Sequence, residues 1–365
     1  MSFRRSVPLF LGRVTGKMPP KLDAAFWRYL RLPKSIPVWR SHGQTRSGDS
    51  ATLISSGIEP RADYFPALFF ENDFEVESLG HLPVLSLGAK IKKLELSADL
   101  LALRMDRIQA RLCFNRSYLR VPEWVRSSLK VPAEIQELAS GHNSLRQDLR
   151  LIRKHGYTVT QSHSTEDFDA FYQSMYLPHG RGRHGPHAHL RSRDNLHEAF
   201  RRGLLLIIKK DGNAISGIVV EKVPSAISFA GIGVLGGDEQ LLKIGALAAA
   251  YYFGLLHARE MGFAKVDLGG TRPCCTDSLL RYKKKWGAVV EPRPLHTNDY
   301  IMRWRSTNSA VSAMLAKFPL IVRDQGQLSA LTVSDRENTG FEIPPGLYRK
   351  IEIPPMTDLE WPIGT

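Results

Sequence analysis

Three glycines and a lysine lie directly before the most apolar helix-like segment of the chain. Gly236, Gly237, Lys243 and Gly245 follow a β-type run and precede residues 246–260. At a helix start several backbone N–H groups lack partners, and the helix dipole favours negative charge, so such a stretch binds anions. We therefore expect these four residues to hold the charged end of a ligand. The alternative is that the glycines form only a tight turn and a helix cap.

Histidines crowd the segment that follows Leu177. His179, His184, His187 and His189 suggest a metal site, but residues 177–190 contain no carboxylate and three glycines. We therefore expect no metal ion there. Imidazole titrates near neutral pH, which makes His184 a candidate general base. The alternative for His184 is a loop residue that contacts substrate.

Arginines in the same segment point to an anionic ligand. Arg181 and Arg183 carry planar guanidinium groups, which bind carboxylates and phosphates through paired hydrogen bonds. The whole chain has 50 Lys and Arg against 36 Asp and Glu, a formal net charge of +14 and a pI of about 9.7. Such an excess predicts an anionic partner, which is a nucleic acid, a phosphate-rich cofactor, an anionic polymer or a lipid head group.

Cysteine content and hydropathy predict a cytoplasmic protein. The three cysteines, Cys113, Cys274 and Cys275, do not suggest a disulfide framework. The apolar run near the first residue is shorter than the roughly 7–15 residues of a signal core. Residues 244–258 form the longest uncharged apolar run, which is below the roughly 18–20 residues that span a bilayer. The basic surface still permits peripheral attachment to the inner face of an anionic membrane.

Hydrophobic periodicity predicts an α/β fold for the second half of the chain. From residue 157 to residue 305 the predicted order is β, α, α, β, β, β, α, β, α, β, β. A basic helix is expected before it at 144–154, and a loop at 177–190. The long helix is expected to start at the glycine pair, 236–237, and to end near Gly262.

The first half is less regular. Residues 1–45 are basic, with a short helix expected at 24–32 before a proline. Residues 46–65 are polar and rich in glycine and serine, so we expect a loop. Alternating apolar residues predict a half-buried strand at 90–96. Residues 100–113 fit a helix and a strand equally well.

Two segments near the end of the predicted α/β region resemble a family signature. The sequence DLGGTRP at 267–273, followed by LLRYKKKWGA at 279–288, is similar to the D-F-G-G … F-K-x-x-[WF]-G signature of Fem-type aminoacyl ligases and related CelD-like acyltransferases. Leu268 replaces the usual aromatic residue, and Tyr282 replaces a phenylalanine. Both changes are conservative.

Other features support this resemblance over residues 143–305. Residues 146–156 match R-x-D-[LI]-R-x-[IL]-x-K-x-G, and residues 171–185 match F-Y-x-x-[MY] … R-H-G. The predicted element order is that of the GNAT acyltransferase fold. The resemblance implies a GNAT-like mixed twisted sheet flanked by helices, preceded by a smaller, degenerate GNAT-like lobe. We find no sequence repeat that would mark such a second copy.

The resemblance also divides the chain into three segments. Residues 1–140 would form the N-terminal lobe, which contacts substrate or is a degenerate GNAT-like copy. Residues 141–306 would form the GNAT-like acyltransferase domain. Residues 307–365 would add a C-terminal helix and an irregular tail that packs on the body.

The resemblance assigns roles to residues in this second domain. In GNAT proteins the strand before the long helix, here 225–234, supplies an N–H that polarises the acyl carbonyl, and the helix start binds the cofactor pyrophosphate. Here the segment retains only K-x-G, at Lys243 and Gly245, of the usual Q/R-x-x-G-x-G/A run. That difference leaves open whether the donor is acetyl-coenzyme A or an aminoacyl-tRNA.

The signature itself contributes the remaining site residues. Asp267 is either catalytic or a structural carboxylate that accepts N–H groups of the turn. Lys283 matches the lysine of the signature and binds either substrate phosphate or the body of the fold. The other substrate-binding residues that the resemblance implies are Gly269, Gly270, Arg272 and Trp286.

The sequence thus predicts an N-acyltransferase of the GNAT superfamily. It would transfer an acyl group from acyl-coenzyme A, such as acetyl-CoA, to an amine or hydroxyl of a cell-envelope or polysaccharide precursor, with a sugar or peptide acceptor. The first alternative is a Fem-type ligase with aminoacyl-tRNA as donor, whose polyanion would suit the net charge of +14. The second is a non-catalytic relative that binds an anionic polymer.

Overall fold

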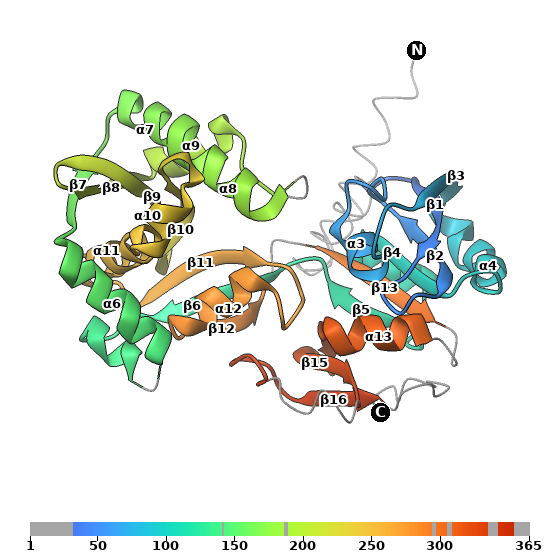
Figure 1. Ribbon diagram of the computed structural model, residues 1–365. Coiled ribbons are helices and arrows are strands. Elements are labelled where there is room, and N and C mark those ends of the chain that lie inside the picture. Colours follow the sequence, from blue (N-terminus) through green and yellow to red (C-terminus); the bar gives the residue numbers. More distant parts are fainter. Residues whose placement is uncertain are drawn as a thin grey trace, which may run out of the picture. The chain divides into compact units, whose positions relative to one another are not determined.

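The computed structural model describes residues 32–140, 142–185, 189–293, 297–304, 309–334 and 342–353 (Figure 1). The described chain forms two compact units. Unit 1 contains the residues up to Glu123 together with 297–313, and unit 2 contains the residues from Trp124 to Arg293 together with those from Met314 onward. Residues 24–31 of the expected N-terminal helix lie outside the described residues.

Unit 1 is built on a mixed sheet, which among the described residues has six strands in the order β3-β1-β2-β4-β13-β5. The strands are β1 (Ser35–Gln44), β2 (Ser50–Ser56), β3 (Glu75–Pro83), β4 (Leu100–Asp106), β5 (Leu119–Pro122) and β13 (Asn298–Trp304). The helices are α3 (Tyr64–Phe69), α4 (Val84–Glu95) and α5 (Arg107–Cys113). Helix α4 packs its apolar face on one side of the sheet, on a core that includes Ile54, Leu101 and Ile301.

Unit 2 contains a longer mixed sheet, which in the described chain has seven strands in the order β12-β6-β11-β10-β9-β8-β7. The strands are β6 (Val125–Lys130), β7 (Thr158–Ser162), β8 (Gly203–Lys210), β9 (Asn213–Val223), β10 (Ala226–Val234), β11 (Lys265–Thr271) and β12 (Val289–Pro292). The helices and helical turns are η1 (Ile135–Ala139), α6 (Asn143–His155), α7 (Thr165–Phe171), η2 (Tyr172–Tyr176), α8 (Leu177–His184), α9 (Arg193–Arg201), η4 (Leu235–Gly237), α10 (Glu239–Lys243), α11 (Ala246–Glu260) and α12 (Ser278–Lys285).

Helices cover both faces of the unit 2 sheet (Figure 1). On one face α6, α11 and α12 close a core that contains Leu149, Leu255 and Trp286. On the other face α7, η2 and α9 close a second core around Phe168 and Leu196. This arrangement confirms the predicted GNAT-like sheet flanked by helices, and the element order from β7 to β13 follows the predicted one except for the added helices α8 and α10 and the short helical turns η2 and η4.

The two units repeat one pattern of strand pairing. In unit 1, β2 pairs antiparallel with β1 and parallel with β4, and β13 then lies antiparallel between β4 and β5. In unit 2, β10 pairs antiparallel with β9 and parallel with β11, and β6 lies antiparallel between β11 and β12. The two sheets therefore share this part of their strand pairing, although the sequence shows no repeat; that unit 1 is a second GNAT-like lobe stays a prediction.

Each of the two expected segments, 1–140 and 141–306, contains one strand of the other sheet. Strand β6 lies within 1–140 but pairs in the unit 2 sheet, and β13 lies within 141–306 but pairs in the unit 1 sheet. The compact units therefore differ from the expected segments 1–140 and 141–306. The physical reason is backbone pairing, because both strands are bonded on each side by strands of the unit to which they return.

The C-terminal region is more ordered than the sequence predicts. Helix α13 (Ser309–Lys317) confirms the expected helix near 307–317. The expected irregular tail instead contains a small sheet of β14 (Leu320–Asp324), β15 (Gln327–Val333) and β16 (Lys350–Ile353). Ile321 and Ala330 of this sheet pack with Val290 of β12 in a common apolar cluster.

Several local expectations for the first half are wrong. The expected strand at 90–96 lies in helix α4, because Val84, Leu87 and Ile91 place an apolar face at helical spacing. The loop expected at 46–65 contains strand β2. Residues 100–113 form strand β4 followed by helix α5, so both alternatives occur in succession. In the part of the chain that the structure describes, no helix has the length and apolar composition needed to cross a membrane.

Candidate functional site

The unit 2 sheet parts between its two parallel central strands. The register of β10 with β11 contains two pairs, Ile227 with Val266 and Ser228 with Asp267. Beyond these pairs β10 bulges between Phe229 and Gly231 against β9, and β11 shifts register between Asp267 and Gly270 against β6. Because each strand follows its outer neighbour, the two diverge and leave backbone groups on their facing edges. The divergence begins on β10, the strand to which the resemblance assigns the acyl carbonyl; a ligand crevice at this place, called the crevice below, stays a prediction.

A glycine of β11 lies where the two strands part. Gly269 has a φ of 78°, and a Cβ placed there would face the carbonyl oxygen of Phe229 at 4.0 Å. A larger side chain at this position would extend into the space between the strands. Positive φ is also unfavourable for residues with a Cβ, so glycine suits both requirements.

Lys283 binds the backbone of β11 at the point where this strand diverges from β10. Its side chain is 2% exposed, and its Nζ donates to the carbonyl oxygens of Gly269 at 3.3 Å and Gly270 at 3.0 Å. Burial lowers the pKa of Lys283 to about 7, while the charges of Asp277 and Asp267 oppose the drop. Of the two roles expected for Lys283, the structure places it in contact with the body of the fold.

Asp267 is bound by two neighbours at the point where the strands part. Its Oδ1 accepts the N–H of Gly269 at 2.8 Å, and its Oδ2 lies 3.2 Å from Nε of Arg126 on β6. These contacts match the structural role that the sequence left open, because they shape the turn and join β11 to β6. A catalytic role for Asp267 stays a prediction.

Two buried polar atoms face each other beneath the crevice. Tyr251 of α11 stacks on Trp286 with ring centroids 5.6 Å apart and meets Tyr282 edge to face at 5.2 Å. The Tyr282 hydroxyl and the Trp286 indole N–H are buried, and neither has a hydrogen bond of normal geometry within the described residues. Burial raises the pKa of Tyr282 well above its usual value, so the hydroxyl stays protonated.

Trp286 itself has no exposed surface. It lies in the core as part of the aromatic cluster with Tyr251 and Tyr282, so it offers no surface to a substrate in this structure. Its indole N–H adjoins the Tyr282 hydroxyl and, as a hydrogen-bond donor, lowers the pKa of that hydroxyl. The proton of the Tyr282 hydroxyl itself has no acceptor within the described residues, and a buried donor without an acceptor is uncommon.

An arginine on the opposite face of the sheet acts on this cluster. Arg183 belongs to α8, which lies on the α7 face, whereas Tyr282 belongs to α12 on the α11 face. The positive charge of Arg183 nevertheless lowers the pKa of Tyr282 and so opposes the rise caused by burial. Side chains from the two faces thus act on each other where the strands diverge.

The glycines before the long helix fall into two separate places. Gly236 and Gly237 form the turn η4, and a Cβ at Gly237 would lie 3.0 Å from the carbonyl oxygen of Pro178 at the start of α8. Helix α10 follows, and the Asp238 side chain caps it by accepting the N–H groups of Gln240 at 2.6 Å and Leu241 at 3.4 Å. The expected single long helix is therefore wrong, and a carboxylate already occupies the α10 start.

The start of α11 is free of such a cap. Gly245 is its N-cap residue, with a φ of 94° and no side-chain cap. Two buried hydrogen bonds fix this corner, from the Tyr157 hydroxyl to Ile244 and from Ser216 Oγ to Ala246, each 2.9 Å long. The first N–H groups of α11 therefore have no partner within the helix, as the anion-binding expectation requires.

Cations lie close to the α11 start. Lys243 is exposed at the end of α10. Helix α6 passes beside the α11 start, because the Cβ of its Leu151 would lie 3.4 Å from a Cβ added at Gly245. Helix α6 carries exposed Arg150, Arg153 and Lys154, for which the described residues provide no ion pair, while its only carboxylate, Asp148, pairs with Lys285.

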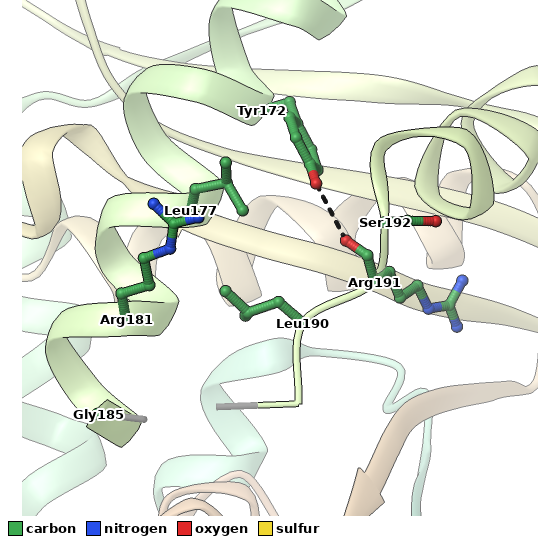
Figure 2. Close-up of a pocket in the computed structure, with 7 residues that line it drawn as sticks. All are labelled: Tyr172, Leu177, Arg181, Gly185, Leu190, Arg191 and Ser192. Atoms are coloured by element: carbon green, nitrogen blue, oxygen red, sulfur yellow. Dashed lines mark hydrogen bonds between the residues drawn. The ribbon is translucent and has the colours of Figure 1, made fainter. Parts of the chain in front are cut away.

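A separate open pocket of about 630 Å³ lies on the α7 face (Figure 2). Leu177 and Arg181 of α8 form one side, and the loop from Leu190 to Ser192 forms the other (Figure 2). Tyr172 closes the end, and its hydroxyl donates to the Arg191 carbonyl oxygen at 3.3 Å. The pocket walls come from residues 20 positions or fewer apart in sequence, so this site is local to the helix–loop–helix segment.

Arg181 is the cation that this pocket offers to a ligand. It is exposed, and no described carboxylate pairs with it. The Arg191 guanidinium points away from Arg181 (Figure 2) and lies 3.9 Å from Glu221, which Arg202 also binds at 2.6 Å. Arg181 and Arg183 were expected to bind one anion together. Residues two positions apart on a helix do not share a face, and in this structure one lines the pocket while the other acts on Tyr282.

Helix α8 occupies the segment that was expected to be a loop. Of the glycines that suggested a loop, Gly180 is required by packing, because a Cβ at this position would overlap Leu190 of the pocket wall. The preceding π-helical turn η2 joins α7 to α8, so the run from Thr165 to His184 is continuously helical. Such turns are rare and are often found at functional sites.

The structure does not test the predicted roles of His184 and Arg272. The structure describes the backbone of His184 at the end of α8 but not its side chain, so its role as general base stays a prediction. His187 lies outside the described residues. Arg272 follows β11 and is half-buried. Within the described ranges no group of three or more His, Cys, Asp or Glu residues is placed to hold a metal ion.

Sequence reasoning missed the most informative residue, Tyr282. It was treated as a conservative replacement of a phenylalanine in the signature. The signal was the added hydroxyl, because at a buried position a hydroxyl needs a partner. Tyr172 and the loop 190–192 were also missed, since their contact depends on the helix α8.

No family model and no curated protein matches this chain. Among solved structures, "L-PGS from Bacillus licheniformis" is 12% identical over 75% of this chain and 87% of that chain, with a TM-score of 0.35. FemX is 14% identical over 69% of this chain and 80% of that chain, with a TM-score of 0.39. An "IAA acetyltransferase from Bacillus cereus" is 14% identical over 40% of this chain and 96% of that chain, with a TM-score of 0.25.

Proposed function

We propose that this protein is an acyltransferase that moves an acyl group from an acyl-coenzyme A thioester to an amine or hydroxyl. The acceptor we propose is an anionic cell-envelope or polysaccharide precursor. The observation that carries the proposal is the parting of β10 and β11 together with a buried Tyr282 hydroxyl whose proton has no acceptor in the described chain. A crevice of this kind admits an extended acyl chain edge-on to backbone N–H and C=O groups.

The residues of the crevice suit an acyl-transfer reaction. The acceptor nitrogen forms a bond to the acyl carbon, and the bond from that carbon to the donor sulfur breaks. The facing edge of β10 provides backbone N–H groups for the oxygen that gains charge. The acceptor nitrogen gives up a proton as the bond forms, and the departing sulfur needs one. In this proposal the Tyr282 hydroxyl, which burial keeps protonated, donates to the sulfur and regains its proton from the nitrogen.

The charged ends of donor and acceptor have separate places in this proposal. The uncapped start of α11, beside exposed Lys243, takes the donor phosphates. Arg181 in the pocket on the α7 face takes a carboxylate or phosphate of the acceptor. The coenzyme supplies only the activated carbonyl. Residues of this chain bind the charged ends, stabilise the oxygen that gains charge and transfer the proton.

An aminoacyl-tRNA is the second candidate donor, and one observation favours it. Arg150, Arg153 and Lys154 are exposed on α6, the helix whose Leu151 borders Gly245. A row of cations leading to the α11 start suits a polyanion that continues beyond a single pyrophosphate. The acyl-transfer chemistry at the crevice would be the same, except that a ribose oxygen would leave instead of a sulfur.

A thermal-shift panel tests both candidates. The full chain is heated with acetyl-CoA, a longer acyl-CoA, free CoA or an aminoacyl-tRNA, because a ligand that binds only the folded state raises the melting temperature. We expect acyl-CoA to raise it at both low and moderate salt. A shift with aminoacyl-tRNA alone, lost at moderate salt, would select the second candidate.

Variants that remove single cations show which site each donor uses. Lys243→Ala should reduce the shift caused by CoA, whereas the pair Arg150→Ala and Arg153→Ala should reduce only a shift caused by tRNA. If no donor changes the melting temperature and no acyl product forms with any of them, the chain is a binding protein without turnover and the proposal fails.

A further inference from the structure

The three most exposed large apolar side chains of the described residues lie on two adjacent helices of unit 1, α4 with its C-cap residue and α5. Leu85 is 89% exposed, Leu96 is 75% exposed and Leu112 is 66% exposed. The next is Tyr348, on unit 2, at 52%. Scattered exposed leucines are ordinary, but three such side chains on two adjacent helices form a patch that needs an explanation.

Two of these leucines share one face of helix α4. Leu85, Ala89, Lys92 and Leu96 follow the spacing i, i+4, i+7, i+11, with Leu96 as the C-cap residue. Residues at this spacing form a stripe along one side of a helix, and the opposite side carries Val84, Leu87 and Ile91, which are buried against the sheet. Helix α4 therefore has two apolar faces, of which the core covers only one.

Helix α5 brings the third leucine to the same place. The Cys113 thiol donates to the carbonyl oxygen of Val84 at 3.2 Å, and a Cβ at Gly88 would lie 2.6 Å from the Cys113 carbonyl oxygen. The end of α5 therefore crosses the start of α4 at backbone distance. Leu112 and Leu85 are the chain neighbours of these contacting residues, so they flank the crossing.

Cations surround this patch, and its one acidic group is already bound. Lys90, Lys92, Lys93 and Arg111 are exposed on α4 and α5, and the described residues give them no ion pair. The only carboxylate within the two helices is Glu95. It accepts from the Tyr118 hydroxyl and lies 3.7 Å from Arg303. We call the leucines and these four cations the α4–α5 face.

We propose that the α4–α5 face binds the surface of a bilayer that contains anionic phospholipids. The leucines enter the boundary between head groups and acyl chains, and the lysines and arginine remain at the level of the phosphates. Exposed apolar residues on a helix with flanking cations are the chemistry that such an interface selects. This assignment does not depend on the proposed reaction, since it concerns a different unit and a different ligand.

A second copy of the chain suits this face less well. A two-fold contact would place the same four cations of each copy opposite one another, and the chain as a whole has a net charge of +14. Like charges in a desolvated contact are unfavourable, whereas an anionic surface neutralises them. The charge of the face therefore selects the lipid.

Flotation of the full chain with vesicles tests the proposal. We use phosphatidylcholine vesicles with and without about 30% phosphatidylglycerol, at about 100 and about 500 mM NaCl. We expect binding to the anionic vesicles at low salt, at least about tenfold weaker binding at high salt, and little binding to phosphatidylcholine alone.

Matched variants separate the face from general charge and hydrophobicity. Leu85→Ser with Leu112→Ser should weaken binding at least about tenfold, since both side chains leave the lipid. Met261→Ser, which removes a 45% exposed apolar side chain from unit 2, should not. Lys92→Glu with Lys93→Glu should weaken binding strongly, while Arg150→Glu with Arg153→Glu, the same change of net charge on α6, should have a much smaller effect.

Other outcomes would overturn the proposal. One is full vesicle binding by the double leucine variant with an unchanged melting temperature. A second is wild-type protein that does not float with anionic vesicles at low salt. A third is a loss of self-association in the leucine variant, measured by sedimentation velocity, without any change in flotation. That last result would assign the face to a second copy of the chain.

Discussion

The amine of Lys283 lies 3.0 Å from the carbonyl oxygen of Gly270, in a site that is almost closed to water. A neutral amine has two N–H groups, enough for this carbonyl and for that of Gly269. Lys283 therefore holds the outer strand of the crevice in place without the need for a positive charge. The geometry makes it a positioning residue for β11.

This arrangement gives unfolding a specific pH dependence. The pKa of Lys283 is about 7 in the folded protein, below the ordinary value of 10.5, so between these values the unfolded state binds a proton that the folded state lacks. The stability contribution of Lys283 should therefore rise with pH through this window, by at most about 1.4 kcal/mol per pH unit. Urea unfolding at about pH 7, 8 and 9 measures it as the difference between wild type and Lys283→Met. A difference that does not change with pH would contradict the assignment.

Removal of the Tyr282 hydroxyl should reduce activity without a loss of stability. The hydroxyl has no hydrogen bond of normal geometry in the described chain, so Tyr282→Phe should leave the free energy of unfolding unchanged or slightly higher. We expect kcat to fall by about 10–1000-fold if this group donates the proton. Tyr157→Phe is the converse control, because its hydroxyl bonds Ile244 and its loss should cost about 1 kcal/mol. Unchanged kcat in Tyr282→Phe would remove Tyr282 from the reaction.

Variants of Gly245 and Lys243 should show separately how backbone strain and positive charge at the α11 start affect stability and donor binding. Gly245 has a φ of 94°, so Gly245→Ala should cost about 1 kcal/mol of stability before any ligand is added. Lys243 is exposed, so Lys243→Ala should change stability by less than about 0.5 kcal/mol and weaken donor binding by about two- to fivefold. Calorimetric titration of CoA measures the second effect. Equal affinity in both proteins would place the phosphates elsewhere.

The two arginines of α8 should affect different kinetic constants. Arg181 lines the pocket, so Arg181→Ala should raise the acceptor KM by about tenfold with little change in kcat. Arg183 acts on Tyr282, so Arg183→Ala should lower kcat, since loss of the cation raises the pKa of Tyr282 further and makes its hydroxyl a weaker acid. Both residues are exposed, and both variants should keep the wild-type melting temperature. The same kinetic effect from the two variants would mean that they bind one ligand after all.

The second half of the chain could be predicted because its signals are local. Strands β8 and β9 are continuous apolar runs joined by Asp211-Gly212, and both turn residues adopt positive φ as a hairpin requires. Gly156 ends α6 in the left-handed conformation, and Ser164 caps α7. Each of these features depends on a few adjacent residues, which the sequence displays directly.

What could not be predicted depends on residues that are distant in sequence. The glycines of α8 suggested a loop, and the fact that Gly180 packs against Leu190 is visible only in the folded chain. The alternation at 90–96 suggested a strand, and it belongs to a helix whose apolar face starts at Val84. At the site, the sequence identified β11 and named Lys243 and Gly245, which lie at the α11 start, but it expected that helix to begin at the glycine pair 236–237. It could not show that Asp238 already caps α10 or that Tyr282 lacks a partner.

The return of β13 to the unit 1 sheet has a consequence for the order in which the two large sheets can form during synthesis. Strand β13 lies between β4 and β5, so the sheet of unit 1 keeps an open seam until residue 304 has left the ribosome. The strands that the structure describes in the long sheet of unit 2 are all present once Pro292 has been made. The sheet whose first strand is translated first is thus completed last, and until then β4 and β5 expose strand edges that can pair with other chains.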